Sequence, residues 1–265
     1  RLLKLFERLG VEIAPSDMSF SVQVPDIGLE WSGSDLSSVF AQRSNLFRPR
    51  FWSMLGDLLR FYRTAPLDRP GLSEDLTLGQ YLDAKGYGRA FQDDHLLPQA
   101  AAIWSAPADT IRDYPAVAFI RFFENHRLLN LIGRPLWRTV EGGSQAYVER
   151  LIEPFRNRVR TGSPVRSIRR DGNWVWVTDG QGAAERFDEV VIATHAKEAL
   201  AMLHQPSARE TELLGAFSYT TNHAVLHTDV RLMPQRRAVW SAWNYLGARS
   251  ADGRRDLCVT YWMNM

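Results

Sequence analysis

The chain has 265 residues, of which 45% are hydrophobic and 23% are charged, so it has the composition of a globular protein with one large domain or two smaller ones. Its formal net charge of +2 gives no bulk electrostatic reason to expect nucleic acid as a partner, and no apolar run is long enough to predict an integral membrane segment. Cys258 is the only cysteine, which excludes an internal disulfide and a multi-cysteine metal site and is consistent with a cytoplasmic location.

The first elements are a helix and a hairpin. Residues 2–9 place apolar side chains on one side of an amphipathic helix that Gly10 ends, which is not the pattern of a signal peptide. Residues 20–24 alternate apolar and polar side chains, the period of a half-buried strand. Residues 28–33 predict its hairpin partner, across a turn at 26–28.

The segment from about residue 35 to residue 131 has mostly helical patterns. Residues 48–67 repeat apolar side chains at helical spacing with a proline near each end, and Thr77 is the predicted N-cap of the following helix. The segment is rich in aromatic residues. We therefore expect it to form either a core or the roof of a pocket.

A glycine pair stands at the centre of the chain, in the stretch WRTVEGGSQAYVERLIEPF of residues 137–155. A short polar strand leads into Gly142, Gly143 and Ser144, and a helix follows. Three uses of this arrangement are open. Ser144 could be a nucleophile, the backbone N–H groups at the helix start could meet a ligand, or the glycines could simply turn the chain with the serine as a cap.

An antiparallel meander is predicted after this helix. Its three strands are residues 163–170, 173–179 and 184–189, and the turns lie at 171–172 and 180–182.

The rest of the chain mixes a different strand, two helices and a return to strands. Residues 188–194 hold a continuous apolar run, which indicates a strand covered on both faces, as in a parallel sheet. Helices are expected over 197–203 and 207–217. Three final strands are predicted at 219–230, 237–246 and 257–265.

Metal and cysteine chemistry are not indicated. The six histidines form neither an HExxH motif nor a Cys/His cluster, so we predict no metal site. His223 and His227 are four residues apart, but in an apparent strand. Cys258 lies in an apolar strand, where a free cysteine is usually a small hydrophobic residue rather than a nucleophile.

The hypothesis that Ser144 is a nucleophile rests on Gly142–Ala146, a partial match to the G-x-S-x-G elbow of α/β-hydrolases. That elbow follows a buried apolar strand, whereas residues 137–141 are polar, and a meander rather than another parallel strand comes after the helix. A serine hydrolase with Ser144 as nucleophile therefore remains only an alternative.

The order of these elements resembles the flavin-dependent amine oxidase and phytoene desaturase-like superfamily, with bacterial FAD/NAD-binding oxidoreductases as the nearest likeness. The resemblance covers the whole chain and is strongest over residues 137–199, where RTVEGGS and its helix precede SPVRSI, a hairpin and ERFDEVVIATHA. It implies FAD as cofactor and a small-molecule substrate. Many amine oxidases use a lysine at the flavin, and the late strands contain none, so amine oxidation and desaturation both stay open.

The resemblance also assigns residues to the cofactor. The Val165 backbone, flanked by Ser163 and Pro164, is expected to contact the FAD adenine. The remaining residues expected beside FAD are Ala193, Thr194 and His195 at a strand end, and Gly142, Gly143 and Ser144 in the glycine turn.

One family feature is missing from the sequence, the G-x-G-x-x-G loop that binds the FAD pyrophosphate. The resemblance thus implies that these 265 residues are an internal stretch of an FAD enzyme, which alone would bind FAD weakly or not at all and would be inactive.

We predict an α+β fold that includes part of an α/β FAD-binding fold. Residues 1–136 would form a substrate-binding region, with strands at about 19–32 under a helical cap of 35–131. Residues 137–206 would form the distal part of the FAD domain, and 207–265 would return to an antiparallel substrate-domain sheet. The predicted pocket is lined by aromatic residues, namely Trp104, Phe122, Phe123, Trp137, Trp243 and Tyr245. Apart from the hydrolase, the remaining alternative is a non-catalytic binding module, and the sequence does not reveal the oligomeric state.

Overall fold

The computed structural model describes residues 2–133, 135–247 and 258–263. The chain forms two compact units, one of Arg1–Gly143 with Leu226–Met265 and one of Ser144–Val225. The domain limits predicted from the sequence, at 136/137 and 206/207, were drawn between functional regions and not between compact units. They remain a prediction.

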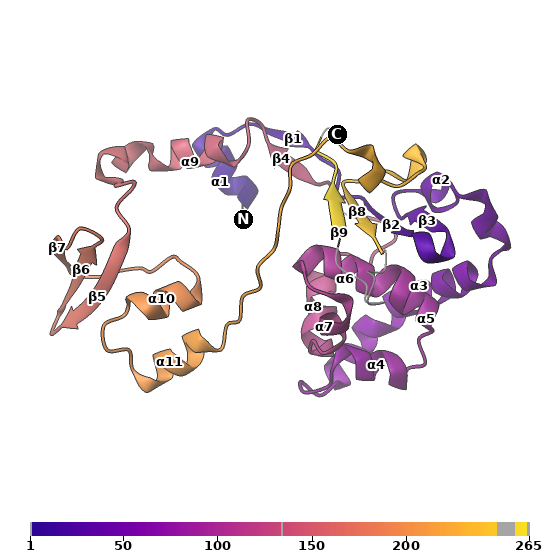
Figure 1. Ribbon diagram of the computed structural model, residues 1–265, viewed down its shortest axis with the longest axis horizontal. Coiled ribbons are helices and arrows are strands. Elements are labelled where there is room, and N and C mark those ends of the chain that lie inside the picture. The colour runs from indigo at the N-terminus through magenta and orange to yellow at the C-terminus, as the bar shows by residue number, and fades with distance from the viewer. Residues whose placement is uncertain (1, 134, 248–257, 264–265) are drawn as a thin grey trace. The chain divides into compact units, whose positions relative to one another are not determined.

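A four-stranded sheet organises the first unit, in the order β3-β2-β8-β9 (Figure 1). The hairpin of β2 (Phe20–Val24) and β3 (Leu29–Ser32) is confirmed, with Gly28 at a φ of 55° in the turn. β8 (Trp243–Leu246) runs parallel to β2 and antiparallel to β9 (Cys258–Tyr261). The sheet is therefore mixed rather than antiparallel throughout. β2 and β8 are far apart in the sequence, so no hairpin turn sets their relative direction.

The predicted helical cap is confirmed in the first unit. Thr77 accepts a hydrogen bond from the Gln80 N–H, as an N-cap should, and a proline begins the longest helix. The helices of this cap are α2 (Leu36–Val39), α3 (Pro49–Asp68), α4 (Leu78–Ala84), α5 (Arg89–Phe91), α6 (Leu97–Trp104), α7 (Ala108–Arg112) and α8 (Ala116–Asn125). A π-helical turn, Gln92–Leu96, joins α5 to α6.

The core of the first unit has two apolar clusters. One lies between the sheet and α3, α5 and α6, where Val22, Trp31, Met54 and Tyr245 are buried together (Figure 1). The other lies among the helices, around the fully buried Phe61, Phe91, Phe119 and Phe123. Because the helices cover it, β2 is buried along almost its whole length.

Shorter elements complete the first unit. α1 (Leu2–Leu9) confirms the opening helix, and β1 (Ile13–Pro15) pairs antiparallel with β4 (Arg138–Val140). The 3₁₀ turns are Pro25–Ile27, Arg43–Phe47, Arg69–Gly71, Val230–Leu232 and Arg237–Val239. No helix in the described part of the chain is long and apolar enough to cross a bilayer.

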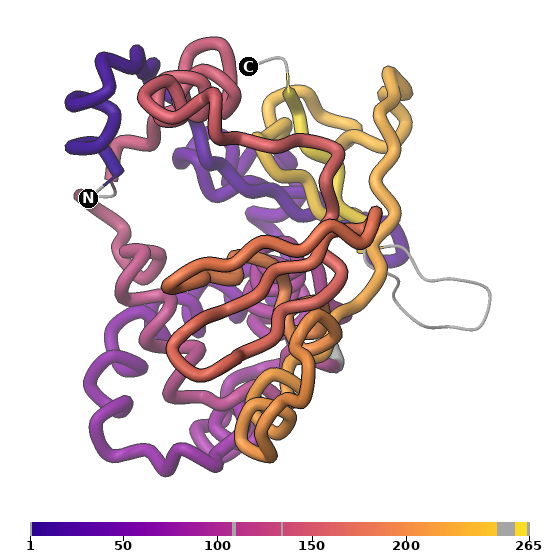
Figure 2. The backbone as a smooth tube through the Cα atoms, turned by 90° about the vertical axis from the view of Figure 1, so that its left-hand side faces the viewer, coloured from indigo at the N-terminus to yellow at the C-terminus, as the bar shows by residue number. Residues whose placement is uncertain are grey.

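The second unit is built on the predicted meander, which is confirmed. β5 (Val165–Asp171), β6 (Trp174–Asp179) and β7 (Ala184–Phe187) pair antiparallel in sequence order, and Figure 2 shows them side by side with tight connections. The turn glycines Gly172 and Gly182 have φ values of 60° and 90°. The helices of this unit are α9 (Ser144–Ile152), α10 (Ala196–Met202) and α11 (Ala208–Gly215), and a 3₁₀ segment, Glu153–Arg158, follows α9.

Two predicted strands are wrong. Residues 188–194 form no strand, and Val191 is 91% exposed, although its sequence resembles a buried parallel strand. Residues 219–229 are also irregular, with Val225 and Leu226 exposed. A strand needs neighbours to complete its ladder, and among the described residues of the second unit the only sheet is the meander. Residues 248–257 and 264–265, assigned above to the returning sheet, lie outside the described residues.

Candidate functional site

The glycine pair forms a tight turn at the end of β4. The N–H of Gly143 donates to the carbonyl oxygen of Val140 at 3.0 Å, and Gly142 and Gly143 have φ values of 78° and 79°. Two successive positive φ values demand glycine, because a side chain in that conformation meets its own backbone. A Cβ added at Gly143 would have no atom within 4 Å, so this face of the turn is open.

Ser144 lacks the surroundings of a nucleophile. α9 begins at Ser144 itself, so the cap position falls on Gly143 and the predicted serine N-cap is wrong. The strand before it, β4, is a short exposed strand paired antiparallel with β1, whereas a nucleophile elbow follows a buried parallel strand. The Ser144 hydroxyl contacts no histidine or carboxylate within the described residues.

Val165 sits at the open edge of the meander. The Gly180 N–H donates to the Pro164 carbonyl at 2.8 Å, which makes this the hydrogen-bonded pair of the ladder. In an antiparallel ladder the next pair, Val165 with Asp179, does not exchange hydrogen bonds. The N–H and C=O of Val165 therefore point away from β6. A β-bulge follows between Val165 and Ser167. Bulges are common at sheet edges, where they change the direction of the strand.

Ala193, Thr194 and His195 lie just before α10, in irregular backbone rather than at a strand end. The His195 ring stacks on Tyr219 with centroids 4.7 Å apart, and the Tyr219 hydroxyl accepts a hydrogen bond from the Ala196 N–H at 2.9 Å. The His195 N–H donates to the Glu198 carboxylate at 3.1 Å. These contacts order the start of α10, although its residues are exposed to solvent.

Three of the six predicted pocket residues form one aromatic cluster. The Trp104 ring lies 4.9 Å from Phe122 and 6.2 Å from Phe123 between centroids, and it stacks on Tyr114 at 5.3 Å. Phe122 in turn stacks on His126 at 4.2 Å. Phe123 is fully buried and belongs to the core, whereas Trp104 and Phe122 are half-buried and pack against that core.

The other three predicted pocket residues lie elsewhere in the first unit. Tyr245 is buried in the sheet core, and Trp243 packs against Tyr261 with centroids 5.5 Å apart. Trp137 precedes β4, and its carbonyl accepts a hydrogen bond from the Ser16 N–H at 2.8 Å. The six aromatics thus occupy three separate places, so lining a common pocket stays a prediction.

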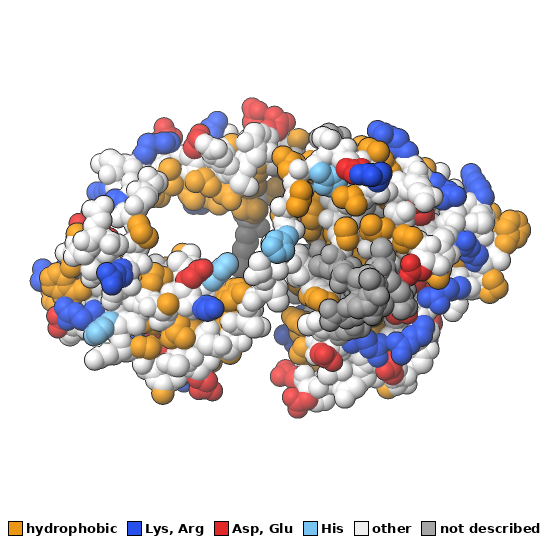
Figure 3. Space-filling model, viewed as in Figure 1, with side chains coloured by type: hydrophobic (Ala, Val, Ile, Leu, Met, Phe, Trp, Pro, Cys, Tyr) orange, Lys and Arg blue, Asp and Glu red, His pale blue; other side chains and the backbone are white. Residues whose placement is uncertain are grey.

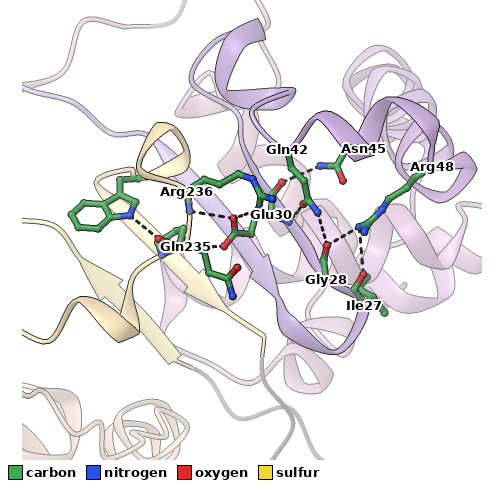
Figure 4. Close-up of polar contacts among 10 residues, drawn as sticks. Ile27, Gly28, Glu30, Gln42, Asn45, Arg48, Gln235 and Arg236 are labelled. Carbon is green, nitrogen blue, oxygen red and sulfur yellow. Dashed lines mark hydrogen bonds and ion pairs between the residues drawn. The ribbon is translucent and has the colours of Figure 1, made fainter.

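Sequence reasoning missed a polar network around Glu30 (Figure 4). The Glu30 carboxylate is almost fully buried and accepts hydrogen bonds from the Gln235 N–H at 2.6 Å and from the Arg236 guanidinium at 2.8 Å. Gln42 donates to the Gly28 carbonyl at 2.7 Å and accepts from the Glu30 N–H at the same distance. No sequence pattern signals this network, because its members come from opposite ends of the chain.

Two shallow cavities border this network. One of about 210 Å³ is lined by Glu30, Gln42, Gln235 and Arg236. The other, of about 320 Å³, is lined by Ile27, Leu29, Phe47, Arg48, Pro49, Arg50, Phe51 and Asp94. None of the predicted site residues lines either cavity.

No metal centre is found among the described residues, where no three His, Cys, Asp or Glu side chains gather. His227 instead accepts a hydrogen bond on Nδ1 from the Asp229 N–H at 3.0 Å. Burial raises the pKa of the Cys258 thiol, so this cysteine is a poor nucleophile, as the sequence indicated.

The family comes from comparison with known proteins. Residues 34–256 match the sequence model of the family described as flavin containing amine oxidoreductase. The chain belongs to this family. The description of the family places its members among the flavoproteins, and the α+β fold of the chain agrees with that of solved oxidases. No curated protein matches the chain.

Solved structures share the fold at low sequence identity. Cyclohexylamine oxidase from Brevibacterium oxydans has a TM-score of 0.57 at 18% identity, over 81% of this chain and 49% of that one. Putrescine oxidase bound to putrescine has a TM-score of 0.53 at 15% identity, over 81% and 49%. A putative protoporphyrinogen oxidase from an Exiguobacterium species has a TM-score of 0.55 at 17% identity, over 94% and 56%. The chain spans about half the length of these structures.

Proposed function

We propose that the protein is an FAD-dependent oxidoreductase that oxidises a small or apolar organic substrate, with this chain supplying mainly its substrate-binding region. The observation that carries the proposal is the family match over residues 34–256, which runs through both compact units. The single cysteine is consistent with a reducing, cytoplasmic location.

The residues present fit part of an FAD site. The outward N–H and C=O of Val165 offer one donor and one acceptor, the pair that an adenine edge needs. The open, side-chain-free face at Gly143 allows a ligand to approach the backbone closely. These features support the assignment to the cofactor of Val165 and residues 193–195 in the second unit and of the glycine turn Gly142, Gly143 and Ser144.

When bound, FAD accepts a hydride from the substrate, and the protein supplies binding, orientation and a dry pocket. Trp104 and Phe122 are suited to the last task, because their half-buried rings present apolar surface beside the fully buried Phe123. Both amine oxidation and desaturation are compatible with an apolar surface formed by these two rings. The late strands contain no lysine that would favour amine oxidation.

The flavin content of the purified full-length protein tests the proposal. We expect yellow protein that releases flavin on denaturation, at about one flavin per chain. Residues 1–265 alone should retain much less, because the sequence contains no pyrophosphate-binding glycine loop. Full-length protein without flavin, which also fails to take up added FAD, would contradict the proposal and favour a non-catalytic binding module.

A different reagent tests the alternative that the protein is a serine hydrolase. A fluorophosphonate probe should label neither the wild type nor Ser144→Ala, because Ser144 has no base within reach among the described residues. Labelling of the wild type that Ser144→Ala abolishes would restore the hydrolase.

A further inference from the structure

β3 is the last strand on one side of the four-stranded sheet. Among the described residues it pairs only with β2, so one of its long edges has no neighbouring strand. Such an edge presents unpaired N–H and C=O groups, which can pair with a strand of another molecule. All four residues of β3 are nevertheless buried. Figure 3 shows a continuous surface, with Lys and Arg side chains on it, where Figure 1 places α2 and the β2–β3 hairpin.

The backbone groups on the free edge of β3 come from alternate residues. The Gly33 N–H donates to the Phe20 carbonyl at 3.2 Å, so Gly33 faces β2. Hydrogen-bonded and non-hydrogen-bonded pairs alternate along an antiparallel ladder, and the N–H and C=O of Glu30 therefore point away from β2. The carbonyl of Gly28, two residues earlier, lies on the same free side.

Gln42 bridges two of these outward groups with one side chain (Figure 4). Its Nε2 donates to the Gly28 carbonyl at 2.7 Å, and its Oε1 accepts from the Glu30 N–H at 2.7 Å. A residue of a parallel neighbouring strand makes the same two bonds, to the carbonyl before and the N–H after the residue opposite it. The Gln42 amide thus takes the place of a strand residue opposite Leu29.

Two further side chains reach the same edge. Asn45, which is fully buried, donates from Nδ2 to the Glu30 carbonyl at 3.0 Å. Arg48 donates to the Gly28 carbonyl at 2.7 Å, a second bond that this oxygen accepts on its other lone pair. We call Gln42, Asn45 and Arg48 the edge plug. Together they bind every outward backbone group from the Gly28 carbonyl to the Glu30 carbonyl that the free edge presents.

The spacing of the plug residues explains why they share one face. Each follows the last by three positions, and a 3₁₀ helix has three residues per turn, so such side chains lie in a row. Gln42 and Arg48 are the caps of the 3₁₀ turn Arg43–Phe47. The Asn45 N–H donates to the Gln42 carbonyl at 2.9 Å, and the Arg48 N–H donates to the Asn45 carbonyl at 3.2 Å. The turn therefore lays two amides and a guanidinium along the strand edge.

We propose that the edge plug prevents two copies of the chain from pairing with each other through β3. When the plug is released, the same N–H and C=O groups become free on each copy, and identical edges can pair antiparallel about a two-fold axis. The plug residues belong to the described chain, so the shielding of β3 needs no further segment of the protein. The shielding is also independent of the proposed oxidoreductase activity, because no plug residue is assigned to the cofactor or to the substrate pocket.

The test is sedimentation velocity of the full-length protein over a range of concentrations, for the wild type and for the double variant Gln42→Ala/Asn45→Ala. Both side chains are replaced because each holds a backbone group of Glu30. We expect the double variant to self-associate at least roughly tenfold more strongly than the wild type, because two released edges gain backbone hydrogen bonds to each other. In dilute solution the Glu30 amide of the double variant should lose its protection against hydrogen exchange, and the protection should return at concentrations where the variant is dimeric.

Gln80→Ala is the matched control. The Gln80 side chain also accepts a hydrogen bond from a backbone N–H, that of Thr77 at 3.1 Å, but it does so at the start of α4 and not at a strand edge. This variant should associate as the wild type does.

The proposal is overturned if the double variant, folded by circular dichroism, associates no more strongly than the wild type. It is also overturned if Gln80→Ala associates as strongly as the double variant, because general loosening of the fold would then explain the effect. If the double variant does not fold, Gln42→Ala alone, which keeps the Asn45 contact, goes through the same comparison, and unchanged association overturns the proposal there too.

Discussion

The carbonyl oxygen of Pro164 accepts a hydrogen bond from the N–H of Gly180 at 2.8 Å, and this contact sets the direction of the backbone at the next residue. Hydrogen-bonded and non-hydrogen-bonded pairs alternate along an antiparallel ladder, so Val165 must turn its own N–H and C=O outward. Within the described residues β5 is an edge strand of the meander. The backbone N–H and C=O of Val165 are therefore directed away from β6.

Val165→Pro should weaken FAD binding to the full-length protein about tenfold, because it removes one outward donor and leaves its acceptor unpaired, at a cost of about 1–3 kcal/mol. The fold should survive, since this N–H is not part of the ladder and proline is accepted at the start of an edge strand. Flavin absorbance and a urea titration measure the two effects separately.

Val165→Ala is the control for this substitution, as it keeps the N–H and shortens only the side chain. It should retain flavin. If Val165→Pro binds flavin as tightly as Val165→Ala does, the backbone of Val165 does not hold the adenine.

Local patterns predicted most of the elements correctly. The alternation of apolar and polar side chains in β2 is a pattern within a few residues, and so are the turn glycines of the meander. Sequence neighbours alone were therefore enough to predict these elements. The strand at 188–194 failed for the opposite reason. Such an apolar run forms a strand only where it pairs with neighbouring strands and is covered on both faces. The described part of the second unit offers no such partner strand, so Val191 stays exposed.

The polar network around Glu30 was harder to predict because its parts are joined by long-range contacts. The Glu30–Arg236 ion pair and the parallel pairing of β2 with β8 link the start of the chain to its end, and no local periodicity encodes them. The aromatic residues show the same limit. Phe122 and Phe123 are adjacent in sequence and belong to the same aromatic cluster, yet Phe122 is half-buried and Phe123 is fully buried in the helical core.

Gly143→Ala should destabilise the protein by about 1–2 kcal/mol, the cost of placing a side chain at positive φ. Steric overlap adds little, since the new Cβ meets no atom within 4 Å. Gly56→Ala is the control. Gly56 also has open space around its Cβ but lies inside α3, so alanine there should stabilise by about 0.5–1 kcal/mol. Urea denaturation measures both, and equal changes at the two positions would contradict the strain argument.

Phe123→Ala should cost about 3–5 kcal/mol of stability, because this ring is fully buried in the helical core. Phe122→Ala should cost clearly less, since its ring is half-buried against Trp104 and His126. Thermal and urea unfolding compare the two. Similar losses at both positions would mean that Phe122 is a core residue, and its assignment to a substrate pocket would then be wrong.

Low pH should destabilise the start of α11, because it protonates Glu210. A side-chain hydrogen bond from Arg170 on β5, with further bonds from the N–H and hydroxyl of Ser207, lowers the pKa of Glu210 to about 2 from its usual 4.5. A carboxyl whose pKa is depressed by folding adds stability above its ordinary pKa, and this stability is lost as the pH falls through the folded value. We therefore expect the protection of amides at the start of α11 against hydrogen exchange, relative to their intrinsic exchange rates, to fall as the pH drops from about 4.5 to about 2.

Glu210→Gln should remove this pH response by taking away the titrating group, whereas Glu212→Gln, in the same helix, should leave it unchanged. Glu212 is exposed and has no ion-pair partner among the described residues. An NMR titration of the Glu210 carboxyl carbon gives the decisive value. A midpoint close to 4.5 would show that the Arg170–Glu210 contact, which links β5 to α11, does not hold in solution.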